Sequence, residues 1–244
     1  MPRAGIVLVA ASEPENMDGQ SIIDRLAETY FNALTYVEHA RIDRRHFSES
    51  FKTSFRSPGK LRYEYSDIKL WVDKPGGIYK NPPERGTSVL WSDGRNCYRK
   101  KFYKPITEQE ESLSAALGIS PGKCPLNGTH SAFLLNSPIA DRRDGVLALA
   151  DITRLSDDYF EGVDCYRLKG SLVSSKDAEV WIAKQNFTLR RLRLKSWFYM
   201  MHKLGIDEDV PDNDGLPFNH ELIYESVRIN EPVDDRLFDP PSNE

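Results

Sequence analysis

The order of apolar and polar residues predicts a chain built mainly of β-strands. Between Phe51 and Tyr65, aromatic or apolar side chains occupy odd positions, with mostly polar residues between them. Successive side chains of a strand point to opposite faces, so this spacing predicts one aromatic face and one polar face. Similar segments predict about ten strands joined mostly by short turns. Their ranges are 36–47, 51–55, 61–65, 68–72, 89–91, 97–103, 146–154, 165–172, 179–183, 189–197 and 220–229.

Helical patterns interrupt this alternation at the start and in the middle of the chain. Near the start, apolar residues recur every four positions, at Ile22, Leu26, Tyr30 and Leu34. This spacing predicts an amphipathic helix that begins at Ser21. Two short central helices are expected, one from a capping box at 107–110 to Gly118 and one over 131–136. Helices that are inserted rather than alternating with strands favour an antiparallel sheet.

Length and charge narrow the classes of protein. The chain has 244 residues, of which 37 are acidic and 33 basic, for a net charge of −4. This balance lacks the basic surface typical of nucleic-acid binders. No stretch reaches the roughly 18 consecutive apolar residues of a membrane-spanning helix. We expect a single domain over 18–244, while residues 1–17 are either a signal remnant or a disordered N-terminus.

No motif in the sequence assembles a catalytic or metal centre. The G-x-S-x-G match at 118–122 follows a predicted helix rather than a strand, and Pro121 has no N–H for an oxyanion. The acidic loop 207–215 lacks the spacing of a calcium-binding EF-hand, and the histidines lack zinc-site spacing. We therefore expect a protein without a cofactor that is not an enzyme. The pairing of the cysteines, Cys97, Cys124 and Cys165, stays open.

Five parts of the sequence resemble one family, and the first is the predicted helix with Leu26, Ala27, Tyr30 and Leu34, which runs into Tyr36. Residues 55–64 read F-R-S-P-G-K-L-R-Y-E, residues 91–94 form a predicted hairpin turn, and 180–191 resemble a strand pair after the central helices. The C-terminal segment, 224–241, resembles the terminal signature of the same family, N-x-P followed by F-x-x-P. Together these segments resemble the LolA/LolB-like superfamily of periplasmic lipoprotein carriers. Ala183 departs from the acidic residue that carriers usually have after Trp-Ile.

The resemblance implies a fold and a function. The fold would be mainly β (α+β), a single open antiparallel half-barrel wrapped over an N-terminal helix and two short central helices. The function would be a non-catalytic periplasmic carrier that holds a lipid or lipoprotein acyl chain between curved sheet and helices, with peripheral membrane contact as a further expectation. The alternative is an envelope-associated sensor or protein-interaction domain that transports no ligand.

Two groups of residues are candidates for binding. The first would line the apolar cavity, although the same residues could form a dry core. Its members are Tyr30, Phe51, Phe55, Tyr63, Tyr65, Trp71, Trp91, Trp181, Trp197, Phe198, Met200 and Met201. The second is a basic docking patch for an acidic partner or lipid headgroups, and it comprises Arg191, Arg193 and Lys195.

Overall fold

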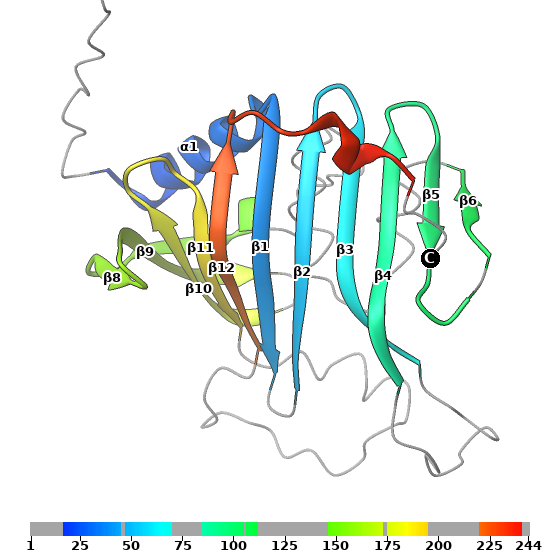
Figure 1. Ribbon diagram of the computed structural model, residues 1–244. Coiled ribbons are helices and arrows are strands. Elements are labelled where there is room, and N and C mark those ends of the chain that lie inside the picture. Colours follow the sequence, from blue (N-terminus) through cyan, green and yellow to red (C-terminus); the bar gives the residue numbers. More distant parts are fainter. Residues whose placement is uncertain are drawn as a thin grey trace, which may run out of the picture.

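The computed structural model describes residues 17–44, 47–69, 84–104, 106–111, 146–172, 175–194 and 220–240. Within these ranges the chain forms one antiparallel sheet of twelve strands, one α-helix and two short 3-10 helices (Figure 1). The first half of the chain contributes α1 (Gly19–Phe31), β1 (Thr35–Arg44), β2 (Phe47–Arg56), β3 (Lys60–Lys69), β4 (Glu84–Asp93), β5 (Cys97–Lys100) and β6 (Glu108–Glu110). The second half contributes η1 (Val146–Ala148), β7 (Ala150–Arg154), β8 (Asp158–Phe160), β9 (Val163–Leu172), β10 (Ser175–Ala183), β11 (Leu189–Leu194), β12 (His220–Ile229) and η2 (Asp235–Phe238).

The last strand joins the two halves of the sheet. The strand order is β6-β5-β4-β3-β2-β1-β12-β11-β10-β9-β7, and β8 pairs with β9 outside this path. β12 lies between β1 and β11, so the chain's C-terminal strand closes the centre of the sheet (Figure 1). The sheet remains open, with β6 and β7 at its two ends. The open antiparallel sheet predicted from the sequence is confirmed.

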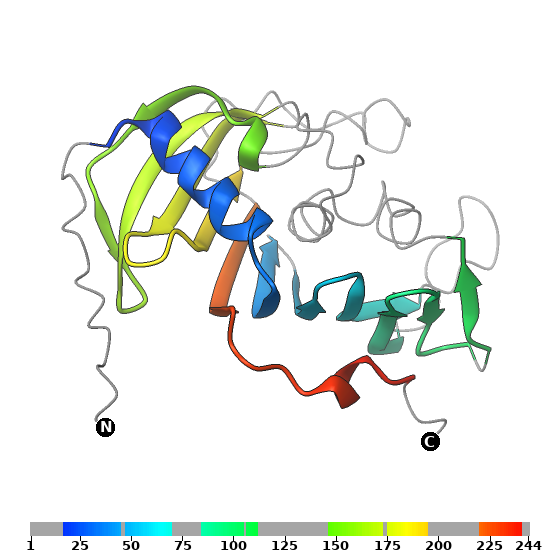
Figure 2. The same ribbon diagram turned by 90° about the horizontal axis from the view of Figure 1, so that it is seen from above.

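The sheet is curved, and α1 lies on its hollow side (Figure 2). The apolar face of α1 is buried at Ile22, Ile23, Leu26 and Tyr30. The Tyr30 ring lies 5.5 Å from that of Tyr36, and its hydroxyl accepts a hydrogen bond from the Leu189 N–H at 3.1 Å. Helix α1 therefore packs on the part of the hollow side that leads from β1 to β7.

The C-terminal tail lies on the outer side of the sheet (Figure 2). There η2 rests on β3 and β4, with Phe238 only 3% exposed. Asp235 forms ion pairs with Arg56 at 2.7 Å and with Lys60 at 3.0 Å. The two sides of β3 therefore face different parts of the molecule, because alternate residues point to opposite sides.

The predicted first or last residues of several helices and strands were wrong. Helix α1 is capped by Asp18, whose carboxylate accepts from the Ser21 N–H at 2.7 Å, so Ser21 lies inside the first turn. The helix ends at Phe31 rather than Leu34, because the chain turns there to enter β1, and Leu34 is 68% exposed. β3 continues without a break to Lys69, since β4 pairs with its whole length.

Two predicted elements have a different type. Glu108–Glu110 forms β6 instead of the start of a helix, because the free edge of β5 accepts it and Arg99 pairs with Glu110 at 3.1 Å. Pairing with an existing edge thus outweighs a local capping signal. Val146–Ala148 forms a 3-10 turn, and the predicted strand begins only at Ala150. The predicted helix over 131–136 and the motifs at 118–122 and 207–215 lie outside the described residues.

Candidate ligand-binding face of the sheet

Strands β2, β3 and β4 carry a continuous aromatic and aliphatic surface on the hollow side. Phe51, Phe55, Leu61, Tyr63 and Leu90 all belong to the buried core, with exposures between 0% and 7%. The register explains why they share a face: Phe55 opposes Leu61, and Tyr63 opposes Leu90. The rings of Phe51 and Tyr63 lie 5.8 Å apart in a tilted arrangement. We call these five residues the aromatic face.

Part of the predicted cavity lining is brought together here. The aromatic face includes the predicted Phe51, Phe55 and Tyr63, and the ring of Tyr65 stacks on that of Tyr63 at 5.2 Å. Tyr30 lies on the same side of the sheet but belongs to α1 and contacts Tyr36. The predicted alternation from Phe51 to Tyr65 is therefore confirmed as one shared, buried face.

Trp91 and Trp181 do not line this face, so their predicted place in the cavity was wrong. Trp91 opposes Arg62 in the register and stacks on Tyr98 at 5.4 Å. Arg62 alternates with Leu61 and Tyr63 of the aromatic face, so Arg62 and its partner Trp91 lie on the outer side of the sheet. Trp181 alternates with the core residues Val180 and Ile182 of β10, so it also lies on the outer side. A large aromatic residue in a strand marks a buried position but does not say which face of the sheet buries it.

Trp181 is covered on the outer side by charged and aromatic groups. The guanidinium groups of Arg167 and Arg191 lie 5.1 Å and 4.7 Å from its ring centroid. Its indole N–H donates to the Asp158 carboxylate at 2.8 Å, and this bond holds the pKa of Asp158 below its usual value. The Phe160 ring, 6.5 Å away, completes the cover. Trp181 is therefore a packing centre of the outer side.

The predicted basic patch lies on this outer side among acidic side chains. Arg191 pairs with Glu221. Arg193 opposes Glu221 on β12 and Glu179 on β10. Glu179 in turn accepts from Arg167 at 2.7 Å. Acidic residues from two neighbouring strands thus offset the positive charge of the patch in its described part, and Lys195 lies outside that part.

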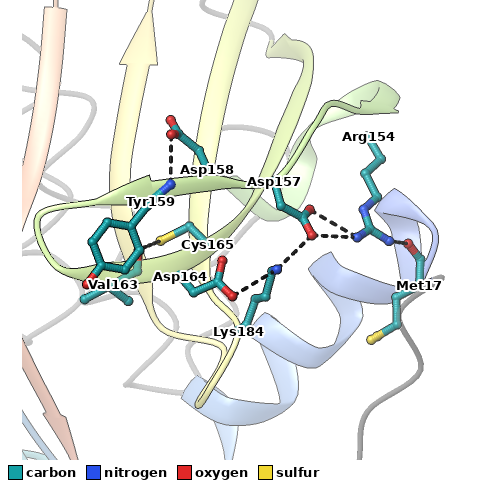
Figure 3. A network of polar contacts seen from close by, with 9 residues as sticks. All are labelled: Met17, Arg154, Asp157, Asp158, Tyr159, Val163, Asp164, Cys165 and Lys184. Carbon is teal, nitrogen blue, oxygen red and sulfur yellow. Dashed lines mark hydrogen bonds and ion pairs between the residues drawn. The ribbon is translucent and has the colours of Figure 1, made fainter.

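A second polar network fixes the beginning of α1 (Figure 3). Arg154 of β7 donates to the carbonyl of Met17 at 2.6 Å and to Asp157 at 3.1 Å. Lys184 reaches the same Asp157 at 2.8 Å and also Asp164 at 3.1 Å. These contacts join Met17, two residues before the helix, to β7 and to the turn after β10. They hold α1 in place on the hollow side of the sheet.

One carboxyl group lies within the core beside the aromatic face. Glu38 of β1 is 1% exposed, and its neighbours on the same face of that strand, Tyr36 and Ala40, belong to the hydrophobic core. Its carboxylate accepts hydrogen bonds from the hydroxyl of Tyr36 and, at 2.6 Å, from that of Thr53. Burial raises the pKa of Glu38, the two hydrogen bonds lower it, and the result is a pKa of about 7. Burial next to Glu38 also raises the pKa of Tyr36.

The sequence pattern of β1 indicates a buried carboxyl at Glu38. Positions 36, 38, 40 and 42 of β1 alternate onto the hollow side, and the other three carry Tyr36, Ala40 and Ile42. An acidic residue in register with three buried apolar residues predicts a buried carboxyl. Only the tertiary structure supplies its partner Thr53, which comes from another strand.

The other predicted site residues lie outside the described part of the chain, and two of the cysteines lie within it. Trp71, Trp197, Phe198, Met200 and Met201 lie outside the described residues. Cys97 and Cys165 are buried free thiols, and burial raises the pKa of each to about 11. In the described ranges, no three His, Cys, Asp or Glu residues gather as a metal site, and no helix is long and apolar enough to span a membrane.

Comparison with known proteins found similar solved structures. No protein-family model and no curated protein matches the chain. LprF from Mycobacterium bovis is 12% identical, with 88% of this chain and 94% of that chain covered and a TM-score of 0.47. The MucA/MucB complex of Pseudomonas aeruginosa is 10% identical, with 89% and 59% covered and a TM-score of 0.48. A LolA superfamily protein from Nitrosomonas europaea is 11% identical, with 92% and 99% covered and a TM-score of 0.32.

The extent of these matches differs between the structures. This chain spans about three fifths of the MucB chains and nearly all of the other two proteins. The described chain itself has the architecture expected from the sequence, an open antiparallel sheet with one described α-helix on its hollow side.

Proposed function

We propose that this protein is a non-catalytic binding module of the bacterial envelope. Its ligand is an apolar molecule such as a lipid or the acyl chain of a lipoprotein. The ligand lies against the aromatic face, between the curved sheet and the helix. The exported location and the class of ligand are both supported by the resemblance of the sequence to periplasmic lipoprotein carriers.

The position of the aromatic face relative to α1 carries this proposal. The main contacts of α1 with other elements are with β7 and η1, and its Tyr30 also contacts Tyr36 and Leu189 at the starts of β1 and β11. The aromatic face belongs to β2, β3 and β4, beyond these contacts. A buried aromatic and aliphatic face on the hollow side, on strands other than those that hold the described helix, has the chemistry that suits an apolar ligand.

The affinity of such a site for a ligand depends more on the length of the acyl chain than on the chemistry of the headgroup. Each methylene of an acyl chain that leaves water contributes about 0.8 kcal/mol. Dispersion contacts with the rings of Phe51 and Tyr63 add to this, since aromatic side chains offer large flat surfaces. We therefore expect affinity to rise with the length of the chain.

Photochemical labelling tests where the ligand lies. The protein is mixed with a long-chain fatty ester that carries a diazirine on its chain, irradiated, digested and analysed by mass spectrometry. We expect label on peptides from β2, β3 and β4, at residues of the aromatic face. Absence of uptake, or label confined to the outer side of the sheet, would contradict the proposal.

A pair of adjacent substitutions provides the matched control. Leu90 and Val89 are neighbours in β4, 2% and 8% exposed, and they point to opposite sides of the sheet. Leu90→Ser and Val89→Ser both remove buried apolar contacts, so they carry similar costs in stability. Only Leu90→Ser should reduce labelling. Equal labelling of both variants, together with capture of a protein partner by the wild type, would favour an interaction domain instead.

A further inference from the structure

We propose that Glu38 determines which apolar ligands the protein accepts, favouring neutral headgroups over anionic ones. This inference rests on the proposed function, because it concerns the same side of the sheet. It adds a selectivity that the apolar surface alone does not supply.

The register places Glu38 in line with the aromatic face. Glu38 opposes Thr53 on β2, Thr53 opposes Tyr63 on β3, and Tyr63 opposes Leu90 on β4. Neighbouring strands lie about 4.8 Å apart, so Glu38 is roughly 10 Å from the strand that carries Tyr63. A ligand against Tyr63 and Leu90 would therefore lie two to three strands from a buried carboxyl.

Among the described residues, the groups that hydrogen-bond to Glu38 are neutral. Tyr36 and Thr53 donate to the carboxylate through neutral hydroxyl groups. The rings that pack nearby from α1 and β12 belong to Tyr30 and Tyr224, and both of these side chains are buried. One cation acts on this cluster from β11: Arg190, which interacts electrostatically with Tyr30.

An ionised Glu38 therefore opposes a second negative charge on the same side of the sheet. Like charges interact more strongly in a protein interior than in water, because the effective dielectric constant is lower. For a headgroup roughly 10 Å from the carboxylate, this repulsion corresponds to about a tenfold loss of affinity. An uncharged ester or amide of the same chain carries no such penalty.

Protonation of Glu38 should remove the discrimination. Burial holds the pKa of this carboxyl near 7, so it is largely ionised at about pH 8 and largely neutral at about pH 6. A free fatty acid of ordinary pKa stays ionised at both values. A change in its relative affinity over this range that is absent in Glu38→Gln therefore reports on this carboxyl.

A matched pair of fluorescent probes tests the inference. Dansylaminoundecanoic acid and its methyl ester share one chain and differ in one negative charge, and dansyl fluorescence rises on transfer to an apolar site. We expect the wild type to bind the ester about tenfold more tightly than the acid at about pH 8. The ratio should approach one at about pH 6. In Glu38→Gln the ratio should stay near one at both values.

Glu225→Gln is the control for net charge. Glu225 lies on β12 and pairs with Arg41 at 2.9 Å, with 49% of its side chain exposed. This variant removes one negative charge as Glu38→Gln does, but from a solvated ion pair, so it should keep the wild-type ratio and its pH dependence. Circular dichroism of each variant verifies folding. If Glu38→Gln does not fold, the wild-type ratio at the two pH values decides the question.

The outcomes separate this inference from the proposed function. Tight binding of both probes by the wild type, with equal affinity at about pH 8, would overturn the role of Glu38 and leave the binding function intact. A pH-dependent ratio that persists in Glu38→Gln would do the same. Failure of the wild type to bind either probe would overturn both proposals.

Discussion

Replacement of Glu38 by Gln should stabilise the protein above neutral pH. Glu38 is fully buried, and burial is the main reason that its pKa lies at about 7 instead of the usual 4.5. Gln has nearly the same shape and cannot ionise. Its amide can accept from one of the two hydroxyls of Tyr36 and Thr53 and donate to the oxygen of the other.

The sign and the size of the effect follow from the two pKa values. Below the unfolded pKa of 4.5, Glu38 is protonated in both states and contributes no penalty. As the pH rises toward 7, the unfolded chain loses this proton while the folded protein keeps it, so the free energy of unfolding falls. Each pKa unit corresponds to about 1.4 kcal/mol, so the ionised carboxyl costs the folded state roughly 3 kcal/mol above neutral pH.

Urea denaturation followed by tryptophan fluorescence measures this cost. The free energy of unfolding is determined for wild type and Glu38→Gln at about pH 4.5, 6 and 8. We expect the two proteins to differ little at the lowest pH, apart from the exchanged hydrogen bonds. At about pH 8 the variant should be more stable by about 2–3 kcal/mol. The difference between the proteins isolates Glu38 from all other titrating groups.

A difference that does not change with pH would refute this reasoning. It would mean that Glu38 titrates alike in the folded and unfolded states, and so that its carboxyl is solvated in the folded protein. Glu225→Gln again serves as the control, because this exposed side chain carries no comparable burial. Its stability should follow that of the wild type at all three pH values.

Three further substitutions test the fold by the same denaturation assay. Asp18→Ala removes the cap of α1, which accepts from the Ser21 N–H at 2.7 Å, and should cost about 1 kcal/mol, while Asp18→Asn should cost much less. Gly170→Ala would place a methyl group 2.6 Å from the carbonyl oxygen of Ala150, so we expect the free energy of unfolding to fall by about 1–3 kcal/mol. An unchanged midpoint would show that β7 can shift away from this methyl group without a cost in stability. Phe238→Ala should cost about 3 kcal/mol and speed amide exchange in β3 and β4, and unchanged exchange there would separate the tail from the sheet.

Local patterns in the sequence predicted most of the described elements. The alternation from Phe51 to Tyr65 identified one face of β2 and β3, because a strand's side chains alternate whatever its partners are. The Asp93-Gly94 pair identified the turn between β4 and β5, since Gly94 has a positive φ of 94°. In each case the signal lies within a few residues of the structure that it specifies.

Non-local contacts explain where prediction failed. Glu108–Glu110 carries a helix-capping signal but pairs with β5, because the open edge of the sheet offers backbone hydrogen bonds. The local sequence does not show that such an edge lies nearby. The β8 strand was missed because it is only three residues long and depends on β9 for its pairing. The sequence pattern also could not show on which side of the sheet Trp91 and Trp181 lie. The outer side of this sheet is covered by other groups, so it too can bury large aromatic side chains.

The amino-acid sequence by itself determined the strand-rich architecture, the amphipathic helix α1 and the aromatic alternation, because each follows from a period of two or about four residues along the chain. Only the tertiary structure decided that β12 joins the two halves of the sheet and that Glu38 meets Thr53 in the core. These outcomes depend on the order in which strands pair, and that order is set by contacts between residues far apart in the chain.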